Sequence, residues 1–150
     1  MSHICYLLFC IYQTLQIISF LAYLKYERGI TGPHLVVVPL SVMSSWSNEF
    51  KRWCPSIRVV RYHGPLAERR RLQKDEARFG QFDVILTTYE MIVGDEDFFR
   101  WKFVWRYLIV DEAHRLKVKC NSNKCFSAPP SFSFTVVLTN IFVALFLISE

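Results

Sequence analysis

The sequence predicts an α/β protein built on a doubly wound parallel sheet, and two observations carry this prediction. Short runs rich in Val, Ile, Leu and Tyr recur at regular intervals and are too short for helices, which favours buried strands. These runs are residues 35–38, 59–62, 84–86 and 107–110. Segments with helical periodicity lie between them. Strands that alternate with helices pair in parallel through right-handed crossovers.

The segments between the strands carry helical signals of different kinds. Residues 42–53 place apolar side chains on one helical face, namely Val42, Trp46, Phe50 and Trp53. Both tryptophans on this face are expected to belong to the core. A charged segment between Pro65 and Gly80 predicts a helix over 66–79. Further helices are predicted over 14–28, 89–93 and 95–101.

Composition is that of one folded domain. The chain has 150 residues, of which 52% are hydrophobic and 16% aromatic, and this excludes intrinsic disorder. The net charge of +5 is compatible with a nucleic-acid partner and equally with a solvated surface. Five cysteines without a CxxC spacing argue against a zinc site or a disulfide framework, so reduced thiols are expected.

Both ends of the chain are apolar and free of charge over long stretches. Residues 1–24 contain no Asp, Glu, Lys or Arg, yet no basic segment or cleavage site marks a signal peptide. Residues 131–148 are about as long as the shortest membrane-spanning helix. The polar Asn140 at the centre of this stretch, and its β-branched and aromatic content, weaken a membrane assignment.

Polar residues follow each predicted strand, and in doubly wound sheets ligands bind at the carboxyl ends of strands. At the end of the last predicted strand, Asp111 offers the oxygen ligands that magnesium prefers. Its neighbour Glu112 is placed to orient or deprotonate an attacking water, and His114 to sense the state of a phosphate. The alternative is that Asp111 and Glu112 form a loop pair that holds no metal.

Hydroxyl residues follow two other predicted strands. Ser41, Thr87 and Thr88 suit the phosphate oxygens of a nucleic-acid backbone, which accept hydrogen bonds without any reading of the bases. The alternative is helix capping, because Ser and Thr at strand-to-helix junctions often satisfy the first backbone amides of the helix.

Three segments together resemble a known family. Residues 32–42 (Gly-Pro-His-Leu-Val-Val-Val-Pro-Leu-Ser-Val) resemble motif Ia of Swi/Snf-type chromatin-remodelling ATPases, which belong to helicase-like superfamily two. Residues 83–91 (Asp-Val-Ile-Leu-Thr-Thr-Tyr-Glu-Met) resemble their next DNA-facing motif, and residues 105–117 contain their DEAH-type motif II. The motif sequences are most similar to those of the imitation-switch subfamily, and the resemblance covers residues 13–117.

The resemblance implies a partial RecA-like lobe of the P-loop NTPase type, the N-terminal lobe of a double-stranded-DNA translocase. It implies that Asp111 coordinates magnesium, Glu112 activates water and His114 couples hydrolysis to movement. Ser41, Thr87 and Thr88 would contact the DNA backbone. ATP and Mg²⁺ are the cofactors of this family, its partners are double-stranded DNA and nucleosomes, and its location is the nucleus.

The chain departs from the family pattern at the P-loop. The family's Gly-Lys-Thr corresponds to Tyr12-Gln13-Thr14, so only Thr14 remains as a cofactor-binding remnant. Glutamine lacks the lysine's positive charge, and the bulky residues 8–11 replace glycines that let the backbone approach the phosphates. The resemblance also stops after residue 117, before the family's motif III and second lobe.

These borders divide the chain into a non-matching segment 1–12, a partial helicase-like lobe 13–117 and a non-matching apolar tail 118–150. The hypothesis is that both ends are foreign to an incomplete motor lobe. We expect a fragment of a nucleosome-sliding motor that does not hydrolyse ATP by itself, with unpaired sheet edges that the tail covers or that promote aggregation. Two alternatives remain: a non-catalytic module that binds the DNA backbone, and a small protein anchored in a membrane by 131–148.

Overall fold

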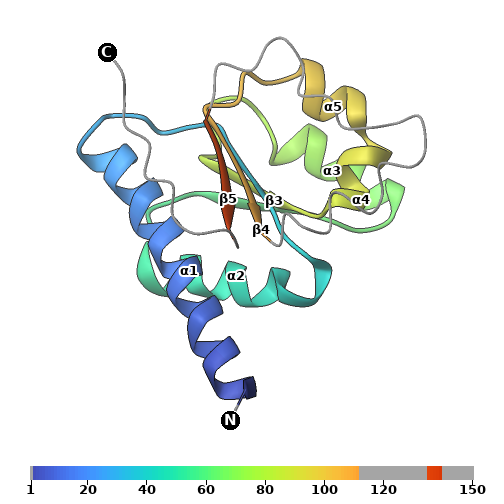
Figure 1. The fold of residues 1–150 in the computed structure, drawn as a ribbon. Coiled ribbons are helices and arrows are strands. Elements are labelled where there is room, and N and C mark those ends of the chain that lie inside the picture. The colour runs from blue at the N-terminus through green and yellow to red at the C-terminus, as the bar shows by residue number, and fades with distance from the viewer. Residues whose placement is uncertain (1, 112–134, 140–150) are drawn as a thin grey trace.

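A computed structural model describes residues 2–111 and 135–139, with side chains from residue 14 to residue 111. Parallel strands form one sheet, and helices cover both of its faces (Figure 1). The strands are β1 (His34–Val37), β2 (Val59–Tyr62), β3 (Val84–Thr87), β4 (Tyr107–Asp111) and β5 (Thr135–Thr139). The helices are α1 (Ser2–Tyr26), α2 (Leu40–Trp53), α3 (Leu66–Asp75), α4 (Tyr89–Gly94) and α5 (Glu96–Trp101).

The strand order in the sheet is β2-β3-β1-β4-β5, and every neighbouring pair is parallel. The predicted parallel α/β sheet is therefore confirmed. In the register of the sheet, Val37 pairs with both Thr87 and Val110. The carboxyl ends of β1, β3 and β4 consequently lie side by side at one edge of the sheet.

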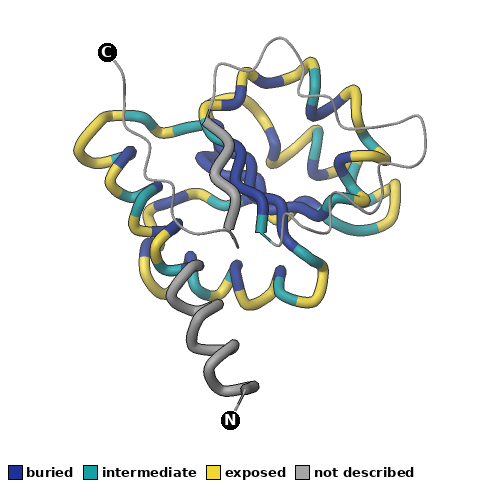
Figure 2. Tube along the Cα trace, in the orientation of Figure 1, coloured by how far each residue is buried: buried dark blue, intermediate teal, exposed yellow. Residues whose placement is uncertain are grey.

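Alternate residues of each strand face two separate hydrophobic cores, as the period of two in a strand requires. One core contains Val36, Leu86 and Ile109 together with apolar side chains of α1 and α2. The other contains Leu35, Ile85 and Leu108 together with side chains of α3, α4 and α5. Figure 2 shows β1, β3 and β4 as the buried centre of the molecule between these helical layers. Burial on both faces explains why the strands read as continuous apolar runs.

The buried face of α2 agrees with the prediction for Trp46 and Phe50 and differs from it at Trp53. Met43, Trp46 and Phe50 are buried, whereas Trp53 has 49% of its surface exposed. The expectation that Trp53 belongs to the core was wrong. Its ring stacks under the guanidinium of Arg52 and its indole donates to Glu49, so polar contacts on the surface accommodate it.

The charged helix after Pro65 is shorter than predicted. It ends at Asp75 rather than at residue 79, and Phe79 is largely exposed. The chain turns back toward the sheet at Ala77, which is fully buried, and the helix therefore stops before Gly80. Gly80 itself has a positive φ, as expected for a residue that ends a helical segment or lies in a turn.

The first helix is much longer than the predicted 14–28. It begins at Ser2 and continues through residues 12–14 without a break, so the positions that match the family's P-loop are helical. Its second half packs on the sheet through Ile17, Ile18, Leu21 and Leu24.

The apolar tail contributes a strand to the sheet. β5 pairs with the outer edge of β4, with Leu138 opposite Val110 and Thr139 opposite Asp111. The expected unpaired edge at β4 is therefore covered. A single helix over 131–148 is excluded because residues 135–139 are extended. Among the residues that the structure describes, no helix is long and apolar enough to cross a membrane.

Candidate functional site

Asp111 ends β4 at the carboxyl edge of the sheet, where the sequence predicted it. Its side chain is half-buried and accepts a hydrogen bond at Oδ2 from the indole Nε1 of Trp46, at 3.1 Å. Trp46 belongs to α2, the helix that follows the neighbouring strand β1. The carboxylate therefore lies at the carboxyl edge of the sheet, where β4 ends beside β1. This is the place where doubly wound sheets bind their ligands.

A magnesium ion is compatible with this carboxylate. Mg²⁺ usually binds one or two protein carboxylates and keeps several waters, so it needs no dense ligand cluster. No group of three or more His, Cys, Asp or Glu side chains gathers within residues 14–111. The predicted catalytic residues Glu112 and His114 lie outside the described residues.

The three predicted DNA-contacting hydroxyls occupy different environments. Ser41 is exposed in the first turn of α2. Thr87 is completely buried, and its hydroxyl donates to the carbonyl oxygen of Tyr62 at 2.9 Å. Thr88 is also buried and stands at the N-cap of α4 without a side-chain capping bond, so the capping alternative is wrong for this residue. DNA contact by these residues stays a prediction, and Ser41 is the one whose side chain reaches solvent.

The residues that match the family's P-loop do not form a loop but lie within α1. Thr14 is buried within α1, and the backbone around it is helical. In the interior of an α-helix each amide N–H bonds to the carbonyl four residues earlier, so it is not available to a phosphate. A phosphate cradle needs a loop of outward-facing amides before a helix N-terminus. The residues at 8–14 therefore do not fit the triphosphate of ATP.

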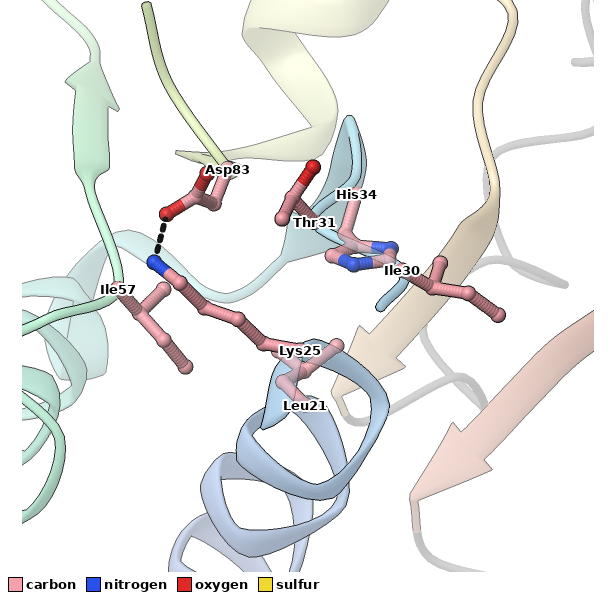
Figure 3. A pocket seen from close by; sticks show the side chains of 7 residues that line it. All are labelled: Leu21, Lys25, Ile30, Thr31, His34, Ile57 and Asp83. Carbon is pink, nitrogen blue, oxygen red and sulfur yellow. Dashed lines mark hydrogen bonds and ion pairs between the residues drawn. The ribbon is translucent and has the colours of Figure 1, made fainter. Parts of the chain in front are cut away.

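A second group of polar residues lines a narrow pocket at the opposite, amino edge of the sheet (Figure 3). Its centre is Asp83, whose carboxylate binds Lys25 Nζ at 2.8 Å and Arg58 Nη2 at 2.7 Å and also accepts the Arg58 amide. Burial alone would raise the pKa of Asp83, but the bonds from Arg58 and Lys25 outweigh it and hold the pKa below its ordinary value. These contacts tie α1 to the starts of β2 and β3.

His34 lines the same pocket and is 2% exposed. Burial lowers its pKa from 6.5 to about 4, against the opposing effects of a backbone hydrogen bond with Ile30 and of the Asp83 charge. Its Nδ1 has no hydrogen-bond partner. The ring is therefore neutral at physiological pH and serves as a packed core residue beside Tyr107.

Comparison with known families shows to which family the chain belongs. Residues 11–128 match the model of the SNF2-related domain. The chain belongs to this family. The resemblance drawn from the three motif segments is thereby confirmed, and the matched region contains Thr14, Ser41, Thr87, Thr88 and Asp111.

Individual relatives agree with this assignment. Over 105 residues the chain is 50% identical to the human SWI/SNF-related matrix-associated actin-dependent regulator of chromatin subfamily A member 1. Over 115 residues it is 46% identical to the Arabidopsis thaliana ISWI chromatin-remodeling complex ATPase CHR11. These matches cover 70% and 77% of the chain but 10% of each relative, so the chain corresponds to a part of such an ATPase domain.

A solved structure supports the fold independently. The Sulfolobus solfataricus SWI2/SNF2 ATPase core in complex with dsDNA matches 85% of this chain and 25% of its own, with a TM-score of 0.66 and 29% identity. The RecA-like architecture implied by the resemblance is therefore confirmed. That SNF2 core was solved on double-stranded DNA, and relatives of the family are named as chromatin-remodelling ATPases.

Sequence reasoning missed the polar role of Trp46. It was assigned to the core, which is correct for its ring, but its indole N–H also reaches Asp111. A signal was present, because a buried tryptophan usually finds an acceptor for its N–H. The Asp83 cluster was missed as well, although an aspartate directly before a buried strand is a sign of a charge that must be paired.

Proposed function

We propose that this chain is part of the first motor lobe of an ATP-dependent chromatin remodeller that translocates on double-stranded DNA, and that the 150-residue chain does not hydrolyse ATP by itself. In this proposal Asp111 holds magnesium, Glu112 activates water and His114 couples hydrolysis to movement. Nucleosomes are the partner and the nucleus is the location. One observation carries the proposed inactivity: α1 runs as a helix through the P-loop positions.

The helical backbone removes two contributions to phosphate binding. The amides of residues 8–14 bond within α1, so they supply no cradle for the β- and γ-phosphates. Gln13 stands where the family has lysine, so no positive charge approaches these phosphates from that position. Asp111 would hold magnesium, which would neutralise charge on the phosphates, and without bound phosphates this contribution would not be realised.

The direct test measures phosphate release by the purified 150-residue chain, with and without double-stranded DNA. We expect no release above buffer and no saturable binding of a fluorescent ATP analogue. The control is Glu112→Gln, which removes the proposed water-activating carboxylate while keeping its size. DNA-stimulated release that Glu112→Gln abolishes would contradict the proposed inactivity.

A second candidate is a non-catalytic module that binds the DNA backbone, and the exposure of Ser41 at the start of α2 favours it. A salt-dependent gel shift with duplex DNA tests this function, because phosphate contacts release counterions and weaken as salt rises. One lost hydrogen bond to a phosphate is worth about 1 kcal/mol, so Ser41→Ala should weaken binding about fivefold.

Ser45 offers a matched control, because it is an exposed serine of the same helix, about one turn farther from its start. Ser45→Ala should leave the affinity unchanged. Thr87→Ala is a poorer probe, since the Thr87 hydroxyl bonds to the Tyr62 carbonyl inside the sheet and its loss disturbs the fold. No binding at low salt, or equal effects of Ser41→Ala and Ser45→Ala, would remove this function.

A further inference from the structure

The hydrogen bond between Trp46 and Asp111 joins two elements that are distant in sequence. Trp46 is 2% exposed, and its indole Nε1 donates to Asp111 Oδ2 at 3.1 Å. The donor belongs to α2, which follows β1, and the acceptor ends β4, which pairs with β1 in parallel. The bond therefore joins α2 to the end of β4 at the carboxyl edge of the sheet.

The position of the indole is fixed by packing. Its ring lies in the core formed by α1, α2 and the sheet, with the Phe50 ring centroid 6.3 Å away and Met43 buried in the same cluster. A side chain held in this way has little rotamer freedom, so its N–H points along one direction. An aspartate side chain rotates readily, and a hydrogen bond from a fixed donor restricts that rotation. Hydrogen bonds to an ionised acceptor are also roughly twice as strong as neutral ones.

Loss of the carboxylate would leave the indole poorly satisfied. The indole N–H is buried, and an unpaired buried donor costs its full desolvation penalty. The bond is consequently favoured whenever α2 and β4 are both in place, which makes the orientation of the carboxylate a property of the fold rather than of a bound ion.

We propose that Trp46 is a positioning residue of the magnesium site: its indole N–H holds the Asp111 carboxylate in the orientation that receives the ion. This inference rests on the proposed function for the role of Asp111 toward magnesium. Trp46 itself touches neither metal nor nucleotide. Groups that orient metal ligands in this way influence metal affinity by about 10-fold to 100-fold when they are removed.

The first experiment tests the bond on the full chain labelled with ¹⁵N in its tryptophan indoles. Trp53 provides an internal control, because its exposed indole donates to the carboxylate of Glu49. Asp111→Asn should shift the indole resonance of Trp46 and leave that of Trp53 in place, and Glu49→Gln should do the reverse. A Trp46 resonance that does not move in Asp111→Asn would overturn the proposal.

The second experiment measures the affinity for Mn²⁺, used as the probe for the magnesium site, by the electron paramagnetic resonance signal of the free ion. Trp46→Phe keeps an aromatic ring and removes the donor. The matched control is Trp105→Phe, since Trp105 is also fully buried and donates to the carbonyl of Phe99 at 2.7 Å, in the core on the opposite face of the sheet. Trp46→Phe should weaken Mn²⁺ binding about tenfold, whereas Trp105→Phe should leave it within about twofold.

The outcomes separate this inference from the proposed function. If Asp111→Asn abolishes Mn²⁺ binding but Trp46→Phe and Trp105→Phe have equal effects, positioning by Trp46 is refuted and the role of Asp111 stands. If Mn²⁺ binding does not depend on Asp111, both are refuted. If circular dichroism shows that Trp46→Phe does not fold, the proposal is tested instead by adding Mn²⁺ to the wild-type chain and measuring the broadening of its indole resonances. Mn²⁺ must then broaden the Trp46 indole resonance more than that of Trp105, and equal broadening would overturn the proposal.

Discussion

Burial of His34 predicts that the chain loses stability in mildly acidic solution. The pKa of this side chain falls from 6.5 to about 4 on folding because burial disfavours the charged ring. Above pH 6.5 the ring is neutral in both states and makes no difference. Between pH 6.5 and 4 the unfolded chain takes up a proton that the folded chain cannot, so the free energy of unfolding decreases. This shift corresponds to a loss of about 2 kcal/mol at pH 5 and about 3 kcal/mol at pH 4.

Urea unfolding followed by circular dichroism at pH 7, 6 and 5 measures this loss. The variant His34→Gln cannot become protonated, and its amide can still donate to the Ile30 backbone, so its unfolding free energy should change by about 2 kcal/mol less between pH 7 and 5 than that of the wild type. His63→Gln, at a less buried histidine after β2, is the control and should keep the wild-type slope. Asp83 does not interfere, because its pKa lies below 3.8 and its stabilising effect is lost only in stronger acid. Parallel pH profiles for wild type and His34→Gln would refute the reasoning.

Two further predictions concern the same amino edge and are tested by urea unfolding at neutral pH. Gly32 has a φ of +114°, and a Cβ there would overlap the carbonyl oxygen of Asp83, so Gly32→Ala should cost about 3 kcal/mol or more. Gly29 also has a positive φ but open space around it, so Gly29→Ala should cost about 1 kcal/mol; equal costs would contradict the clash. Asp83→Asn removes a buried charge with two cationic partners and should cost about 3 kcal/mol. Glu68→Gln, at an exposed pair with Arg71, should have no measurable effect, and a similar loss in both variants would show that the burial of Asp83 is not the cause.

Strands β1, β3 and β4 were predictable because they are buried on both faces, and the edge strand β2 because of its run of Val59 and Val60. Each of β1 to β4 was located within one residue from its apolar run alone. The buried stripe of α2 was less predictable, since Met43 is buried with Trp46 and Phe50, Val42 is only partly buried against the same core, and Trp53 at the end of the helix is exposed. A helical repeat of 3.6 residues allows several overlapping stripes, and the packing of α2 against α1 and the sheet decides which of its residues are buried.

The position of Asp111 at the ligand edge followed from its place after a strand, but its partner did not. The helix that lies beside the end of a strand depends on the order of the strands in the sheet. In that order β1 and β4 are neighbours, although β2 and β3 separate them in the sequence. The same limit applies to Thr87. Its hydroxyl reads as a ligand for phosphate in the sequence, yet the pairing of β2 with β3 places it within bonding distance of the Tyr62 carbonyl.

The P-loop region shows why a missing charge and a missing backbone conformation are different defects. Gln13→Lys would restore the family's cation, but the amides of residues 8–14 would still bond within α1. We therefore expect Gln13→Lys to leave binding of a fluorescent ATP analogue undetectable, with an unchanged helical signal in circular dichroism. A variant that also places glycines at 8–11 weakens the helix by about 1 kcal/mol per glycine and should lower the helical signal. Saturable ATP binding by Gln13→Lys alone would show that charge, and not the helical backbone, is what the site lacks.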